Sequence, residues 1–190
     1  MKTVLFVPGS GEGLHARDYR AVLNAIKSKG YKAKFVPITW PRTTIDKWVT
    51  ELAAVYGKYD PPDTILAGFS WGAMTSFAVA AERAPAELWL FSLSPYFMED
   101  LGSLPKSWLT KIGHRRVSAF QNTSFSRLAA QIGCPVKLFA GERELRKWPA
   151  TSRRFHDAAK KFKDCAMVIV PDAGHEIEHA NYITALRENI

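Results

Sequence analysis

The sequence predicts an α/β protein, with a doubly wound, mostly parallel sheet of about six strands and helices on both of its faces. Six apolar runs have the length and the β-branched or aromatic content of buried parallel strands. These runs cover residues 3–7, 33–38, 64–69, 88–93, 136–140 and 166–170. Segments with helical periodicity separate most of the runs, and this alternation is typical of a parallel sheet in a three-layer architecture.

The helices are predicted from apolar residues that recur every three or four positions, which marks one face of a helix. The first two stripes are Tyr19, Val22, Leu23 and Ile26, then Ile45, Trp48, Leu52 and Val55. Residues 73–83 are rich in alanine and contain no helix breaker, as expected for a helix packed on a sheet. The last two stripes are Phe155, Ala158, Ala159 and Phe162, then Ile183, Leu186 and Ile190.

Residues 95–133 interrupt the alternation after the fourth strand. They contain Gly102, Pro105 and Gly113, with short periodic pieces at 108–112 and 126–132. Because long insertions in compact domains are usually functional or loosely ordered, we interpret this segment as a small lid over an active site. A purely structural crossover is the alternative. We expect residues 1–190 to form one domain that includes this insertion.

Composition narrows the class of protein. The chain has 190 residues, 47% of them hydrophobic, which is ordinary for one soluble globular domain. Its two cysteines, Cys134 and Cys165, are too few for a disulfide framework, and we expect reduced thiols. No stretch is long and apolar enough for a membrane span, and the first apolar run is too short for a signal peptide. These features predict a cytoplasmic protein without membrane insertion.

The positive charge is concentrated in the second half of the chain. The formal net charge is +8, and residues 106–164 alone carry fourteen Lys or Arg against four Asp or Glu. Such a region could attract an anionic substrate or an acidic carrier protein, or it could be a solvated helix surface. Nucleic acid is not an expected partner, because the basic residues are not interleaved with aromatic ones as in a nucleic-acid-binding module.

Ser70 is the candidate nucleophile. It lies in the segment Gly68-Phe69-Ser70-Trp71-Gly72, where a predicted strand ends and a predicted helix begins. A sharp strand-to-helix turn needs glycines two positions before and after the serine, because larger side chains would collide with the turn. The turn also places the serine at a helix N-terminus, where free N–H groups favour negative charge.

With these elements in order, the chain resembles a small member of the α/β-hydrolase superfamily over nearly its whole length. The resemblance implies a serine nucleophile, an acid after a late strand and a histidine after the next strand. In Pro171-Asp172-Ala173-Gly174-His175 the histidine is His175. In Gly141-Glu142-Arg143-Glu144 the spacing after the glycine selects Glu144, although aspartate is the commoner acid there. Glu142 is the competing candidate, and we expect whichever glutamate is not the acid to pair with Arg143 or Arg146.

The resemblance also implies two backbone donors for an oxyanion. One is the N–H of Trp71, directly after the nucleophile. The other comes from the loop Pro8-Gly9-Ser10-Gly11-Glu12-Gly13, where Ser10 fits best by position and Gly11 next. Pro8 stands where the family often has histidine, but the expected donor is a main-chain group. The loop does not match Gly-x-Gly-x-x-Gly, so it does not predict a dinucleotide site.

The predicted function is therefore a serine hydrolase that cleaves a carboxylic ester or thioester through a Ser-His-Glu triad and an acyl-enzyme. No cofactor or metal is expected. The expected substrate is a small acyl compound, with anionic or carrier-bound compounds among the candidates, and Arg115 and Arg116 are expected to help capture it. An acyltransferase or a non-catalytic binding protein on the same fold are the alternatives. Six residues are candidates for an apolar acyl pocket or for ordinary packing: Trp40, Trp71, Tyr96, Phe97, Met98 and Trp148.

Overall fold

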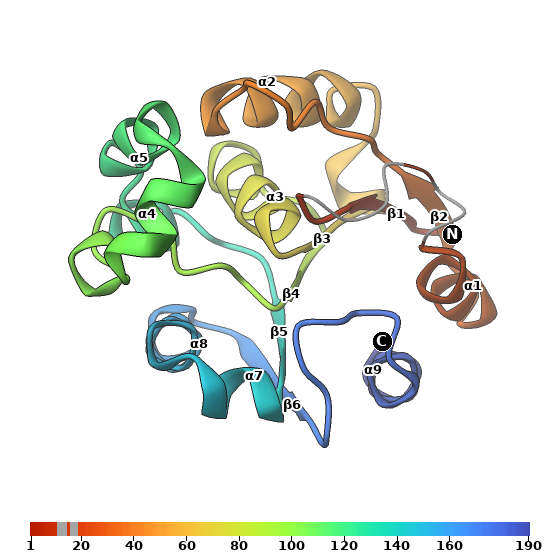
Figure 1. The fold of residues 1–190 in the computed structure, drawn as a ribbon. Helices are drawn as coiled ribbons and strands as arrows, with labels where there is room; N and C mark the ends of the chain where they lie inside the picture. The colour runs from red at the N-terminus through yellow and green to blue at the C-terminus, as the bar shows by residue number, and fades with distance from the viewer. Residues whose placement is uncertain (11–14, 16–18) are drawn as a thin grey trace.

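The computed structural model describes residues 1–10, 15 and 19–190, and its strands form one parallel sheet (Figure 1). The strand order is β2-β1-β3-β4-β5-β6, and each neighbouring pair runs parallel. The strands are β1 (Thr3–Val7), β2 (Lys32–Phe35), β3 (Thr64–Phe69), β4 (Glu87–Phe91), β5 (Val136–Gly141) and β6 (Cys165–Val170). The predicted parallel sheet of six strands is confirmed.

The second strand is shorter than the predicted 33–38. The N–H of Val36 still donates to the carbonyl of Phe6 at 2.8 Å, one residue beyond the end of β2. Pro37 follows and has no N–H with which to extend the ladder. Val36 and Ile38 are nevertheless buried, so their apolar character reflects packing beyond the end of the strand.

Helices cover both faces of the sheet (Figure 1). They are α1 (Arg20–Ser28), α2 (Ile45–Tyr56), α3 (Trp71–Glu82), α4 (Lys106–Ile112), α5 (His114–Gln121), α6 (Phe125–Ala129), α7 (Glu142–Lys147), α8 (Pro149–Lys161) and α9 (Ala180–Asn189), with short 3-10 turns at Pro61–Asp63 and Leu101–Ser103. The first and the last of these helices, α1 and α9, pack together on one face. Helices α2, α3 and α8 lie on the other, so the three-layer arrangement expected from the sequence is confirmed.

Alternation along the strands divides the core into two clusters. In β1, Val4 and Phe6 contact the α1/α9 layer, whereas Leu5 and Val7 face the layer that contains α3. This follows from the two-residue period of a strand, which sends successive side chains to opposite faces. The central strands β1, β3, β4 and β5 are therefore largely buried, as in other parallel sheets. The edge strands β2 and β6 are not, and the expectation of a buried strand at 166–170 is wrong, because β6 has one neighbouring strand and leaves Met167 44% and Ile169 45% exposed.

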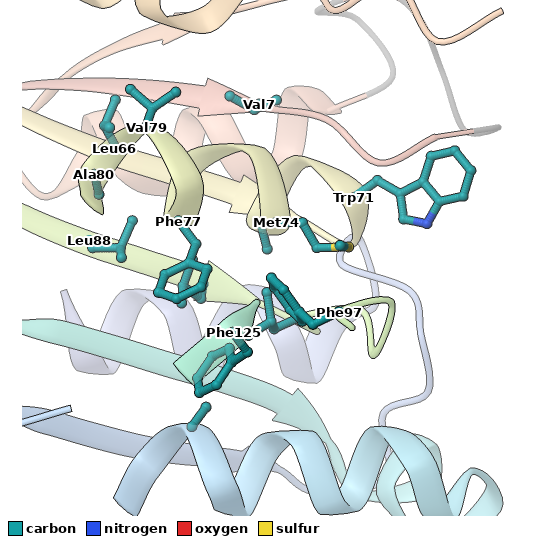
Figure 2. Close-up of a cluster of buried hydrophobic side chains, with 14 of the residues drawn as sticks. Val7, Leu66, Trp71, Met74, Phe77, Val79, Ala80, Leu88, Phe97 and Phe125 are labelled. Carbon is teal, nitrogen blue, oxygen red and sulfur yellow. The ribbon is translucent and has the colours of Figure 1, made fainter. Parts of the chain in front are cut away.

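The insertion is helical and contributes to the core. Residues 101–129 form the 3-10 turn and helices α4, α5 and α6. Figure 2 shows Phe77 of α3 beside Phe97 and Phe125, and the ring centroids of Phe77 and Phe125 are 5.1 Å apart. Because Phe97 and Phe125 are almost completely buried, the ends of the insertion are anchored. Lid motion between these anchors remains a prediction.

Both cysteines are free, with Cys134 buried and Cys165 partly buried. Burial raises the pKa of each thiol to about 11, which keeps them protonated at neutral pH. In the part of the chain that the structure describes, no helix has the length and apolar character needed to cross a membrane.

Candidate active site

Ser70 lies in the turn between β3 and α3 and has an unusual backbone conformation. Its φ is 57° and its ψ is −117°, a region that residues with a side chain rarely occupy. The N–H of Ser70 donates to the carbonyl of Phe91 at 2.9 Å, which ties the turn to the end of β4. This strained turn projects the side chain from the edge of the sheet where the strands end.

The two flanking glycines are required by close backbone contacts. A Cβ at Gly68 would lie 2.2 Å from the carbonyl oxygen of Gly72. A Cβ at Gly72 would lie 2.3 Å from the carbonyl oxygen of Pro8. Both distances are far below van der Waals contact, so any side chain at either position would displace the backbone. The steric role expected for these glycines is confirmed.

The structure brings Ser70, His175 and Glu144 together in one hydrogen-bonded line. His175 Nε2 lies 2.9 Å from Ser70 Oγ, and His175 Nδ1 lies 2.8 Å from Glu144 Oε1. The buried carboxylate of Glu144 accepts the Nδ1 proton, so Nε2 is left to accept the hydroxyl proton of Ser70. Glu144 comes from the first turn of α7, and His175 comes from the loop after β6.

Glu142, the competing acid, makes different contacts at the protein surface. Its Oε1 accepts a hydrogen bond from Arg146 at 2.6 Å, and its Oε2 accepts one from the N–H of Asp172 at 3.1 Å. The hydrogen bond from Asp172 and the charge of Arg146 lower the pKa of Glu142. Glu142 thus pairs with Arg146, one of the two expected partners, and tethers the loop that carries His175.

A second close contact holds the acid and histidine loops together. A Cβ at Gly141 would lie 2.4 Å from the carbonyl oxygen of Gly174. The N–H of Arg143 also donates to the carbonyl of Ala173 at 2.9 Å. The glycine at the end of β5 therefore allows the histidine loop to cross directly over it.

Two residues behind Glu144 were not predicted from the sequence. Ser92 donates to Glu144 Oε2 at 2.6 Å, and the hydroxyl of Tyr182 lies 2.8 Å from Ser92 Oγ. Because the Ser92 proton points to the carboxylate, the Tyr182 hydroxyl donates to Ser92 Oγ. Burial, and then the charge of Glu144, raise the pKa of Tyr182 well above its usual value, so it stays a donor. Both oxygens of the carboxylate are therefore hydrogen-bonded.

Ser94 was also not predicted, and it lies beside the candidate nucleophile. Its Oγ is 3.1 Å from Ser70 Oγ, and the residue is only 4% exposed. Since the hydroxyl proton of Ser70 points to His175 Nε2, the Ser94 hydroxyl is the donor in this pair. Ser70 Oγ is thus held from two sides. The one sequence signal for Ser92 and Ser94 is that they come within three residues of the end of β4, at the same edge of the sheet as Ser70.

The expected oxyanion donors also lie at this edge. Trp71 is the first residue of α3, so its N–H has no acceptor within the helix. Ser10 lines the same cavity as Ser70 and Trp71. The N–H of Gly9 is already committed to the Tyr19 hydroxyl at 3.0 Å. Gly11, the second choice from the sequence, lies outside the described residues.

The candidate site opens into a cavity of about 670 Å³. Four aromatic side chains line it, together with Lys111, Arg116 and the site residues. These aromatic residues are Trp71, Tyr96, Trp108 and Trp148. Trp71, Tyr96 and Trp148 were pocket candidates from the sequence, whereas Trp108 was not.

The other aromatic and apolar pocket candidates do not line this cavity. Trp40 and Phe97 are buried in the core, which corresponds to the packing alternative. Met98 is 49% exposed on the surface. Among the described residues, no group of three or more His, Cys, Asp or Glu side chains is placed to hold a metal ion.

Comparison with known proteins identifies the fold. No protein-family model and no curated protein matches the sequence. Solved structures do match: Est1E from Butyrivibrio proteoclasticus has a TM-score of 0.80 at 18% identity, over 98% of this chain and 86% of that one. A bromoperoxidase from Bacillus anthracis has a TM-score of 0.75 at 12% identity, over 98% and 89%. The thioesterase domain from the curacin biosynthetic pathway has a TM-score of 0.69 at 16% identity, over 98% and 89%. The chain has the α/β-hydrolase fold.

Proposed function

We propose that the protein is a serine hydrolase that cleaves a carboxylic ester or thioester through an acyl-enzyme on Ser70. The observation that carries the proposal is the line of contacts from Ser70 Oγ to His175 Nε2 at 2.9 Å and from His175 Nδ1 to Glu144 Oε1 at 2.8 Å. A nucleophile, a base and a group that orients the base are thereby within hydrogen-bond reach of one another. A fold alone does not define an activity, so the proposal depends on this geometry.

Acylation begins when Ser70 Oγ attacks the substrate carbonyl carbon while His175 Nε2 takes the hydroxyl proton. The carbonyl oxygen becomes an oxyanion that accepts hydrogen bonds from the N–H groups of Trp71 and Ser10. Glu144 stays ionised and stabilises the imidazolium that forms. The intermediate then collapses: the bond to the leaving group breaks, His175 donates its proton to that group, and the acyl group remains on Ser70.

Deacylation repeats these steps with water. His175 removes a proton from a water molecule, and the resulting hydroxide attacks the acyl carbon between the same oxyanion donors. Collapse breaks the bond to Ser70 Oγ, which recovers its proton from His175. The products are the carboxylic acid and, from acylation, the alcohol or thiol. Ser94 donates to Ser70 Oγ in the resting state and keeps the nucleophile in place between turnovers.

Hydrolysis of p-nitrophenyl acetate and p-nitrophenyl butyrate, together with short acyl thioesters, tests this proposal. We expect turnover by the wild type and a loss of at least about a thousandfold in kcat for Ser70→Ala and His175→Ala. His156→Ala, which changes an exposed histidine outside the cavity, is the matched control and should keep wild-type rates. A folded wild type that hydrolyses none of these compounds would instead support a binding protein.

A further inference from the structure

The charged side chains that line the cavity are unbalanced. Among the described residues that line it, Lys111 and Arg116 are the cations and Glu144 is the carboxylate. The Glu144 side chain is only 1% exposed, and its two oxygens are bound by His175 and Ser92. Glu144 therefore does not pair with a cation across the cavity, and the described lining residues carry a net positive charge.

Arg116 is held by two backbone carbonyls and an aromatic ring, and no carboxylate of the described residues pairs with it. Its Nε donates to the carbonyl of Thr43 at 3.1 Å and its Nη2 to the carbonyl of Trp40 at 2.6 Å. The guanidinium lies over the Trp71 ring, 5.0 Å from the ring centroid. Within the described part of the chain, no carboxylate is within ion-pair distance of Arg116 or Lys111. Burial, and then the charge of Arg115, lower the pKa of Arg116.

Arg115 differs from its neighbour. It is exposed, its guanidinium donates to the carbonyl of Arg42, and it does not line the cavity. From the sequence, both Arg115 and Arg116 are expected to help capture the substrate. The structure separates them, because adjacent residues of a helix point about 100° apart. Arg115 thus provides a control of equal charge next to the residue of interest.

The chemistry of the proposed mechanism orients a substrate in the cavity. The leaving group must lie near His175, which protonates it, and the Trp148 ring lies 5.8 Å from the imidazole ring. We place the acyl group at Trp71 and Tyr96, which also line the cavity and whose ring centroids are 6.0 Å apart. Arg116 packs on the Trp71 ring, so it lies at the acyl side of the cavity.

We infer that the cavity selects acyl substrates with a second, anionic group at the far end of the acyl chain. A carboxylate there would accept a charge-assisted hydrogen bond from the guanidinium of Arg116, with Lys111 adding charge at the exposed rim. The aromatic walls would enclose the chain between the anion and the ester. This inference rests on the proposed hydrolase function, and it names the class of substrate: esters or thioesters of dicarboxylic acids.

Two esters of matched size test this inference. One is the mono-p-nitrophenyl ester of adipic acid, and the other is the p-nitrophenyl ester of adipamic acid, in which a neutral amide replaces the carboxylate. For the wild type at low salt we expect kcat/KM to be about tenfold or more higher for the anionic ester. The preference should fall as NaCl is raised, because salt screens the attraction.

The variants localise the effect. We expect Arg116→Gln to remove most of the preference for the anionic ester and Lys111→Gln to reduce it by about two- to fourfold. Arg115→Gln removes the same charge outside the cavity, and we expect it to keep the wild-type preference. Should Arg116→Gln fail to fold, the wild-type preference and the exposed Lys111→Gln still decide the question.

The possible failures can be distinguished. Equal or better hydrolysis of the neutral ester by the wild type would overturn the inference and leave the proposed function standing. An equal loss of preference in Arg115→Gln and Arg116→Gln would also overturn it, since the effect would then be general surface charge. Hydrolysis of neither ester, with no covalent labelling of Ser70, would overturn the proposed function and this inference with it.

Discussion

Removal of the Ser92 hydroxyl tests how the acid is held. Ser92 is completely buried and donates to Glu144 Oε2 at 2.6 Å. We expect Ser92→Ala to leave that oxygen without a partner in a site that water does not reach. A hydrogen bond to a charged group contributes about 1.5–3 kcal/mol. If this loss is transmitted in full to the transition state, kcat/KM falls by about 10- to 150-fold.

A second substitution separates the hydroxyl from the backbone. Ser92 has a φ of 47°, which alanine disfavours and glycine tolerates. We therefore expect Ser92→Gly and Ser92→Ala to lose similar activity, with the alanine variant less stable by about 1 kcal/mol. Tyr182→Phe removes only the donor to Ser92 Oγ and leaves the bond to Glu144 in place. Its kcat/KM should fall by less than about threefold.

The assay is kcat/KM for p-nitrophenyl acetate, with urea unfolding to measure the stability of each variant. The result that refutes the reasoning is a folded Ser92→Gly with activity within twofold of the wild type. The hydrogen bond from Ser92 would then not be needed to orient Glu144. A loss in Tyr182→Phe as large as that in Ser92→Gly would contradict this order and show that the Ser92 hydroxyl orients Glu144 only when Tyr182 donates to it.

Five further substitutions test the acid, the histidine loop, a buried ion pair and the pH dependence of stability. Glu144→Gln should lower kcat by about a thousandfold or more, whereas Glu142→Gln should lower it by less than tenfold, and equal losses would leave the acid unassigned. Gly141→Ala should produce a folded protein with severely reduced activity, because its Cβ would lie 2.4 Å from a carbonyl oxygen of the histidine loop; wild-type activity would contradict this. Arg154→Met, which leaves one partner of a buried 2.6 Å ion pair uncompensated, should reduce the free energy of unfolding by about 3–5 kcal/mol in urea, and a loss below 1 kcal/mol would contradict it. Although burial alone raises the pKa of Glu99, hydrogen bonds from the start of α6 outweigh it and lower that pKa to about 2. The free energy of unfolding should therefore fall as pH drops from about 4.5 to 2. Glu99→Gln should remove about 1 kcal/mol of that pH dependence, a small value because the carboxylate is exposed. An unchanged pH profile of stability in Glu99→Gln would refute this role of Glu99.

The sheet and the hydrogen-bonded residues Ser70, Glu144 and His175 could be predicted from the sequence, because each of them depends on a local sequence pattern. Apolar runs mark the strands, and Ser70, Glu144 and His175 each follow a different strand. The carboxyl ends of parallel strands meet at one edge of the sheet, so residues that follow them come together although they are far apart in the chain. The distances between the three side chains agree with that expectation.

The supporting residues could not be predicted in the same way. Ser92 and Ser94 are ordinary serines after β4, and only the register between β4 and its neighbours places one behind the acid and the other beside the nucleophile. Tyr182 reaches the site from α9, on the opposite layer from α3. The distinction between Arg115 and Arg116 likewise depends on the orientation of the short helix α5.

Mass spectrometry of the protein after treatment with a fluorophosphonate tests the central claim most directly. We expect one covalent adduct per chain, located by peptide mapping on Ser70, with no adduct in Ser70→Ala and much slower labelling in His175→Ala. The activated serine should react although the chain contains many other serines. A folded wild type that stays unlabelled, or an adduct on a serine other than Ser70, would contradict the assignment of Ser70 as the nucleophile.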